Sequence, residues 1–343
     1  MTDAENPSRN SQVFLKQVPT GLLGPEDFEV RQAPVPTAQE GEVVVESHYL
    51  SLDAALRLIV RDSKEFLFRV EPGDLVRNSV AGRIVESNHP DWAVGDYVIS
   101  SIGVQNYGVS DGSDLEKCDL SRAPLSSWLG AMGVSGLTAY FAIFDECKPQ
   151  PGQTVVVNGA AGAVGTIAGQ LAKMTGARVI GIAGGPEKCA RLVDDLGFDA
   201  AVDYKRDDLY EQLVEAAPER IDFVFDNVGG RVLDESLRWI AMRGKVLLCG
   251  STSQYAADAI AGPSQYIWLG TMRASMQGYV VYDYADRFDV ARRHMAEWHR
   301  AGTLKFPEHV FEGDVSEFGQ AFLDLYSGKN FGKMVVKLPA AEG

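Results

Sequence analysis

The feature that most constrains this chain is a regular alternation of strand-like and helix-like segments over residues 127–304. Short apolar runs such as TVVVNGA (154–160) and RVIGIA (178–183) alternate with amphipathic segments such as PEKCARLVDDL (186–196). Alternation of this kind is typical of βαβ units, in which helices cover the faces of a parallel sheet. The sequence therefore predicts an α/β fold with a doubly wound parallel sheet in this region.

The first part of the chain has a different texture. Apolar runs such as EVVVESHYLSL (42–52) and GDYVISSI (95–102) are separated by Gly, Asp and Pro. This pattern is typical of a β-rich barrel or sandwich. The segment after residue 304 predicts a helix followed by one more strand.

A glycine-rich turn follows the first predicted strand of the βαβ series. In VVVNGAAGAVG, the residues Ala160, Gly162 and Gly165 occupy the three positions of a dinucleotide-binding fingerprint, and a helix begins near Ala163 and Val164. The small residues let the backbone approach a pyrophosphate, and the start of the helix offers free N–H groups. Because a strand precedes this turn and a helix follows it, we expect it to hold a dinucleotide.

The end of the second predicted strand indicates which dinucleotide binds. An acid that holds a ribose 2′-hydroxyl is expected about 20 residues after the glycine turn, but residues 183–185 are Ala-Gly-Gly. Lys188 follows at the start of the next helix, and Tyr204 and Lys205 follow the third strand. Glu187 is the one acid nearby, and one turn of helix would direct it outward. The pattern predicts a site for a 2′-phosphate, and hence NADP(H) rather than NAD(H).

The charge balance and the cysteines exclude several other classes of protein. The net charge of −15 argues against nucleic-acid or membrane partners. The four cysteines are scattered without a CxxC pair, which predicts reduced thiols and a cytoplasmic location. The first twelve residues contain no apolar core of a signal peptide.

The five histidines do not suggest a metal centre. None has cysteine or glutamate neighbours in a ligand pattern, and His294 and His299 are five residues apart, off a single helical face. No metal is therefore expected.

Several motifs together resemble one known family. They are GLTAYF (136–141), AAGAVG (160–165), GIAGGPEKC (181–189), DNVGG (226–230), GKNFGK (328–333) and YLSLDAALR (49–57). They resemble the medium-chain dehydrogenase/reductase superfamily, and more narrowly its zinc-independent branch of leukotriene B4 dehydrogenases, prostaglandin reductases and curcumin reductases. The resemblance extends over nearly the whole chain.

The resemblance implies a two-domain architecture. A GroES-like, β-rich catalytic domain would comprise residues 1–126 and 305–343, around a Rossmann domain of residues 127–304. The active site would lie in the cleft between these domains.

The resemblance also assigns roles to individual residues. Tyr255 would be the catalytic residue and would also contact the cofactor. Besides the glycine turn and its first helical residues, the implied cofactor-binding residues are Thr138, Gly184, Lys188, Tyr204, Asn227, Cys249 and Asn330. Thr138, Tyr255 and Asn227 also have purely structural alternatives as core hydroxyls and a turn amide.

Without a metal to polarise a carbonyl, conjugate reduction fits better than interconversion of an alcohol and a ketone. A hydride would add to the β-carbon of an enone or enal, and hydrogen-bond donors such as Tyr255 would stabilise the enolate. The alternatives are a quinone reductase or a reductive cyclase that uses the same hydride. An alternative of another class is a non-catalytic NADPH-binding or structural protein.

Departures from the family pattern fall near the expected substrate cleft. Ala54 and Ala55 replace Pro-Tyr, Val134 and Ser135 replace Met-Pro, and Ala256 replaces Asn after Tyr255. The cofactor motifs are intact. The pattern suggests an atypical, larger substrate, such as that of a tailoring reductase in secondary metabolism.

A homodimer is also expected. QGYVVYDY (277–284) reads as the sixth strand of the parallel sheet, with no proline or lysine to protect an open edge. Pairing of this edge with its copy across a two-fold axis would satisfy its backbone groups.

Overall fold

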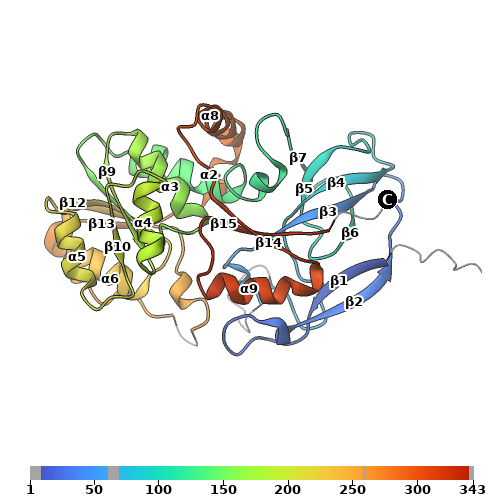
Figure 1. Ribbon diagram of the computed structural model, residues 1–343, viewed down its shortest axis with the longest axis horizontal. Helices are drawn as coiled ribbons and strands as arrows, with labels where there is room; N and C mark the ends of the chain where they lie inside the picture. The colour runs from blue at the N-terminus through green and yellow to red at the C-terminus, as the bar shows by residue number, and fades with distance from the viewer. Residues whose placement is uncertain (1–8, 61–68, 258–259, 340–343) are drawn as a thin grey trace, which may run out of the picture. The chain divides into compact units, whose positions relative to one another are not determined.

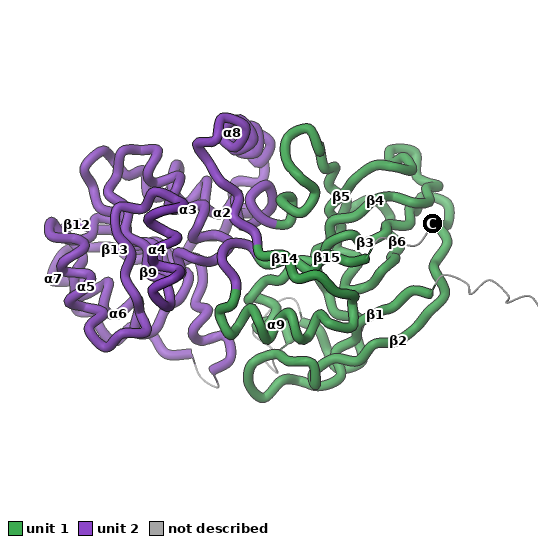
Figure 2. The backbone as a smooth tube through the Cα atoms, viewed as in Figure 1, with its two compact units in different colours: residues 1–129, 309–329, 334–343 green, residues 130–308, 330–333 purple. Residues whose placement is uncertain are grey.

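The computed structural model describes residues 9–60, 69–257 and 260–339. The chain divides into two compact units (Figure 2). Unit 1 comprises residues 1–129, 309–329 and 334–343, and unit 2 comprises residues 130–308 and 330–333. The short segment 330–333 therefore belongs to unit 2, although unit 1 provides the residues on both sides of it.

Unit 2 is built on a six-stranded parallel sheet in the order β10-β9-β8-β11-β12-β13. Figure 1 labels β9, β10, β12 and β13 of this sheet. Its strands are β8 (Thr154–Asn158), β9 (Arg178–Ala183), β10 (Ala200–Asp203), β11 (Ile221–Asp226), β12 (Ile240–Leu248) and β13 (Ser275–Gly278). Its α-helices are α2 (Val134–Phe141), α3 (Ala163–Met174), α4 (Pro186–Asp194), α5 (Leu209–Ala216), α6 (Gly230–Arg238), α7 (Ile267–Met272) and α8 (Phe288–Arg300). The predicted parallel α/β sheet is confirmed.

Helices α5 and α6 bury one face each against this sheet. Leu209 and Leu213 of α5 and Leu237 of α6 share a core with strand residues such as Val156 and Ile180. β8 is buried along its whole length, as expected of a central strand covered on both faces.

Unit 1 contains a seven-stranded sheet in the order β14-β15-β3-β4-β5-β7, with β6 paired to β3, and a separate β1-β2 ribbon. Its strands are β1 (Arg9–Leu15), β2 (Phe28–Pro34), β3 (Val43–Ser51), β4 (Val80–Ser87), β5 (Tyr97–Ser100), β6 (Tyr107–Ser110), β7 (Glu116–Lys117), β14 (Glu308–Glu312) and β15 (Lys333–Lys337), and its helices are α1 (Leu56–Ile59) and α9 (Phe318–Tyr326). Phe318 and Phe322 of α9 are fully buried in the core of this unit. The predicted β-rich fold of the first part of the chain is confirmed.

The sequence prediction is wrong for the sixth strand. β13 ends at Gly278, and Val281–Arg287 is a 3-10 helix instead of strand. The first residue after β13 packs within unit 2, because Tyr279 is buried and its hydroxyl donates to the carbonyl oxygen of Thr138 at 3.0 Å. An apolar run of this length does not by itself distinguish a strand from other buried structure.

Candidate functional site

The glycine turn joins β8 to α3 at the carboxyl end of the sheet, as predicted. Gly162 is the N-cap of α3 and has an extended backbone. A Cβ on Gly165 would lie 2.4 Å from the carbonyl oxygen of Gly159, so the close approach of helix and turn requires glycine there. A Cβ on Gly162 would meet only that same oxygen, at 3.3 Å. The packing of the chain does not require glycine at 162, which fits a position where a ligand approaches the backbone.

The other predicted residues of the turn pack against β9 or begin α3. Ala160 is fully buried, and a Cβ on Gly181 of β9 would lie 2.9 Å from the Ala160 methyl group. Ala163 and Val164 begin α3 and are half-buried. The first N–H groups of a helix have no partner within it, so they are available to an anion.

The 330–333 segment lies against this turn. The backbone N–H of Gly332 donates to the carbonyl oxygen of Ala161 at 2.8 Å, and Gly332 forms a parallel bridge with Gly162. Asn330 is buried, and its side-chain amide donates to the carbonyl oxygen of Gly332 at 2.9 Å. The structure thus brings the predicted residue Asn330 into the same unit as the glycine turn.

Two lysines and a tyrosine gather where β9 and β10 end. Lys188, in the first turn of α4, is half-buried, and Glu187 is exposed, as the sequence suggested. Burial lowers the pKa of Lys188, and the positive charge of Lys205 lowers it further, against the opposing effect of Glu187. Within the described ranges, no carboxylate forms an ion pair with Lys188 or Lys205. Two neighbouring unpaired ammonium groups favour a bound anion.

Tyr204 covers the second glycine-rich turn. A Cβ on Gly184 would lie 2.9 Å from the Tyr204 hydroxyl oxygen and from two of its ring carbons. Only a residue without a side chain allows the ring this position. The predicted residues Gly184, Lys188 and Tyr204 therefore lie in one place, at adjacent strand ends.

A buried carboxylate organises the ends of β11 and β12. Asp226 is fully buried and accepts hydrogen bonds from Asn158 Nδ2 at 2.7 Å and from the backbone N–H of Gly229 at 3.0 Å. Burial raises its pKa, and these N–H donors oppose that shift. Asn227, the next residue, donates from its side chain to the carbonyl oxygen of Asn158 at 3.1 Å. The sequence reasoning missed Asp226, although a polar residue ending a buried strand is a recognisable signal.

Tyr255 follows a 3-10 helix, Thr252–Gln254, just beyond β12. Its ring is buried, and its hydroxyl oxygen accepts the backbone N–H of Ser251 at 3.4 Å. Burial is the main cause that raises the pKa of Tyr255, so the hydroxyl keeps its proton near neutral pH. Burial also raises the pKa of the neighbouring Cys249 thiol, to about 12, which excludes a thiolate nucleophile there.

Thr138 is buried in the middle of α2. Its carbonyl oxygen accepts the hydroxyl of Tyr279, the residue that follows β13. Tyr279 was not predicted as part of the site, because the bond depends on a contact between segments far apart in the chain.

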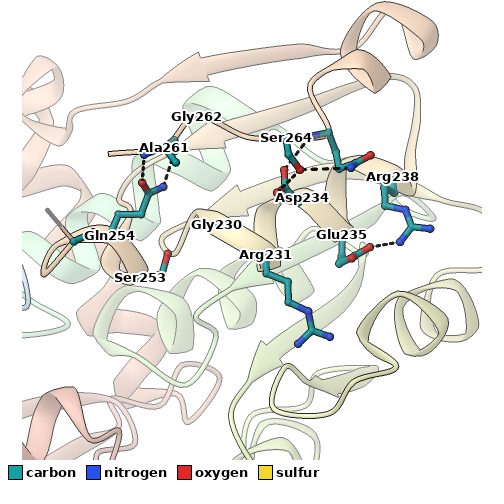
Figure 3. Close-up of a pocket in the computed structure, with 12 residues that line it drawn as sticks. Gly230, Arg231, Asp234, Glu235, Arg238, Ser253, Gln254, Ala261, Gly262 and Ser264 are labelled. Atoms are coloured by element: carbon teal, nitrogen blue, oxygen red, sulfur yellow. Dashed lines mark hydrogen bonds and ion pairs between the residues drawn. The ribbon is translucent and has the colours of Figure 1, made fainter. Parts of the chain in front are cut away.

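A pocket of about 560 Å³ opens beside α6 (Figure 3). Its polar groups largely pair with each other. Gln254 exchanges two hydrogen bonds with the backbone of Ala261, and Asp234 accepts from Ser264 Oγ. Glu235 is paired with Arg238. The bond from Ser264 to Asp234 joins the segment before α7 to α6, and we assign the pocket no ligand.

No group of three or more His, Cys, Asp and Glu side chains in the described ranges is placed to hold a metal ion. No helix of that part of the chain is both long and apolar enough to cross a membrane.

The chain is similar to known oxidoreductases along most of its length. Residues 11–118 match a family model described as the N-terminal domain of oxidoreductase, and residues 163–297 match one described as zinc-binding dehydrogenase. The NADPH-dependent curcumin reductase of Escherichia coli is 37% identical over 338 residues, which cover 96% of this chain and 97% of that protein. Prostaglandin reductase 1 of Bos taurus is 37% identical over 318 residues, or 91% of this chain and 94% of that protein. The crystal structure of CurA in complex with NADPH from Vibrio vulnificus matches with a TM-score of 0.90 and 37% identity, over 96% of this chain and 99% of that one.

Proposed function

Because this chain belongs to the zinc-independent branch of the medium-chain dehydrogenase/reductase superfamily, we propose that it is an NADPH-dependent reductase of the carbon–carbon double bond in α,β-unsaturated carbonyl compounds. The observation that carries the cofactor assignment is the pair of unpaired lysines, Lys188 and Lys205, beside Tyr204 at the ends of β9 and β10. The relatives named curcumin reductase and prostaglandin reductase support the substrate class.

The residues of unit 2 fit the proposed cofactor along its length. The glycine turn and the start of α3 would bind the pyrophosphate, and the lysines with Tyr204 would bind the 2′-phosphate. Asn227, Cys249 and Thr138 would line the nicotinamide end. When bound, NADPH supplies the hydride for the β-carbon of the substrate.

Tyr255 is the candidate for stabilising the negative charge that develops on the carbonyl oxygen. Its oxygen already accepts the Ser251 N–H, which leaves the hydroxyl proton free to donate. Because its pKa is raised, this proton is retained near neutral pH. A donor of this kind accelerates the reaction by roughly a hundred- to a thousandfold.

A direct test is NADPH oxidation with curcumin as the probe, followed by mass spectrometry of the product. We expect NADPH consumption and a product that has gained two hydrogens at the double bond and kept its carbonyl groups. NADPH binding without oxidation of an enone panel would contradict this function and favour a non-catalytic role. A quinone panel and a search for ring-closed products test the quinone reductase and cyclase alternatives.

We also infer that two copies pair through β13. This strand ends the order of the described six-stranded sheet, and the large apolar side chains of Tyr266, Ile267, Val280 and Tyr282 are exposed around it. An open strand edge with apolar surroundings favours pairing.

The Tyr279 N–H donates toward β12, so by strand alternation the Met276 N–H faces outward. Met276→Pro should therefore convert a dimer into a monomer near 37.2 kDa by light scattering. A wild type with the monomer mass would contradict the dimer.

A further inference from the structure

One carboxylate oxygen connects the two turns that carry the proposed 2′-phosphate site. Asp203 is the last residue of β10. Its Oδ1 accepts the backbone N–H of Gly185 at 2.8 Å and the backbone N–H of Lys205 at 3.0 Å. Gly185 is the N-cap of α4, one turn before Lys188, and has a φ of +94°. Together with the backbone bond from the Tyr204 N–H to the carbonyl oxygen of Ala183, this carboxylate oxygen therefore sets the position of Lys188 relative to Lys205.

This carboxylate joins the turns without pairing with either ammonium group. In the part of the chain that the structure describes, the hydrogen bonds to the Asp203 side chain come from backbone N–H groups, and no lysine or arginine forms an ion pair with it. The lysines remain available to an anion. A carboxylate that binds backbone groups can set geometry near a phosphate while leaving the cations unpaired.

Arg231 of α6 holds the second turn from another direction. Its guanidinium donates to the carbonyl oxygens of Tyr204, Arg206 and Asp207, at 3.3, 3.0 and 2.9 Å. The side chain extends from α6 in Figure 3. Three carbonyls bound by one planar group leave the turn after β10 little freedom to shift.

We propose that Asp203 is a positioning residue that sets the preference for NADPH over NADH by holding the turn of Lys188 against the turn of Tyr204 and Lys205. This role rests on the proposed NADPH-dependent function and adds to it. NADH lacks the 2′-phosphate, so its binding does not depend on the distance between the two turns.

The experiment measures dissociation constants of NADPH and NADH for three full-length proteins: wild type, Asp203→Ala and Asp203→Asn. We expect Asp203→Ala to lower the ratio of NADPH affinity to NADH affinity about tenfold, because the phosphate contacts weaken without being removed. We expect Asp203→Asn to stay within about twofold of wild type, because the amide oxygen can accept both N–H groups. Both variants lose the negative charge of Asp203, so loss of charge alone would not produce this difference between them.

Asp199→Ala is the matched control. Asp199 accepts the backbone N–H of Val179 at the opposite end of the same strands, at 2.7 Å. This variant should lower the melting temperature and leave the cofactor ratio unchanged. It separates a general loss of stability from a change in the phosphate site.

An unchanged ratio in Asp203→Ala, or an equal loss in Asp203→Asn, would overturn the proposal. If Asp203→Ala does not fold, Asp203→Val removes the same acceptor with a side chain that favours a strand, and an unchanged ratio in that variant would overturn the proposal instead. A wild type that binds NADPH and NADH equally would contradict the proposed cofactor, and with it the role of Asp203.

Discussion

Within the described part of unit 2, charged side chains such as Lys173 are paired at one end of the parallel sheet and others such as Lys188 are unpaired at the other. At the amino end, Lys173 binds both oxygens of Asp199, at 2.8 and 2.7 Å, beside the start of β9. At the carboxyl end, Asp203 and Asp226 accept backbone N–H groups, and Lys188 has no carboxylate partner among the described residues. A charge that is paired contributes to stability, whereas one that is kept unpaired is available for binding. The difference separates the end that supports the fold from the end that we assign to the cofactor.

The largest expected effect comes from removing the unpaired charges. Lys188→Ala combined with Lys205→Ala should weaken NADPH binding about a hundredfold, because charge-assisted contacts to the phosphate are lost. NADH binding should change little. Fluorescence titration with both cofactors measures this, with Lys173→Ala as a lysine control at the paired end. Parallel losses for NADPH and NADH would show that the lysines do not read the 2′-phosphate.

A smaller effect is expected from moving Tyr204. Gly184→Val would place a side chain where the Tyr204 ring lies, 2.9 Å from its hydroxyl oxygen. The displaced ring should weaken NADPH binding about tenfold if it contacts the phosphate. Gly270→Ala is the control, since nothing lies within 4 Å of a Cβ there. Normal NADPH affinity in Gly184→Val would contradict the assignment of Tyr204 to the 2′-phosphate site.

The affinity for NADPH should also fall at alkaline pH. The folded protein lowers the pKa of Lys188 below its ordinary 10.5, mainly through burial. The phosphate binds the charged form, so NADPH affinity should fall a few-fold as pH rises through this lowered pKa, while NADH affinity stays level. Lys188→Arg keeps its charge throughout and should flatten the profile. A profile that is identical for the two cofactors would contradict this assignment.

The smallest effect is expected at the paired end of the sheet. Lys173→Met removes a partly exposed ion pair and should lower the free energy of unfolding by about 0.5 kcal/mol. NADPH affinity should not change. Chemical denaturation and cofactor titration of the same variant measure both quantities. A change in NADPH affinity would mean that the ion pair at the amino end of the sheet affects cofactor binding at the carboxyl end.

Local features of the site could be predicted from the sequence, and long-range ones could not. The turn at Gly162 and the place of Lys188 follow from a strand, a turn and a helix that are consecutive in the chain. The bonds of Asp203 to Gly185 and of Arg231 to Tyr204 join different βαβ units, so no short pattern signals them.

The error over 277–284 has the same origin. An apolar run predicts burial, but only the packed structure shows what the side chains bury against. Tyr279 is directed to the carbonyl of Thr138, and the chain then turns into a 3-10 helix at Val281.

The bond from Gly332 to Ala161 has a consequence for how the protein is made. A ribosome delivers the glycine turn about 170 residues before the 330–333 segment. Domains that are continuous in sequence can fold as soon as they emerge, but unit 2 lacks its last segment until residues 330–333 have been made. A fragment that ends at residue 308 would keep all six strands and yet leave the dinucleotide turn without this backbone partner.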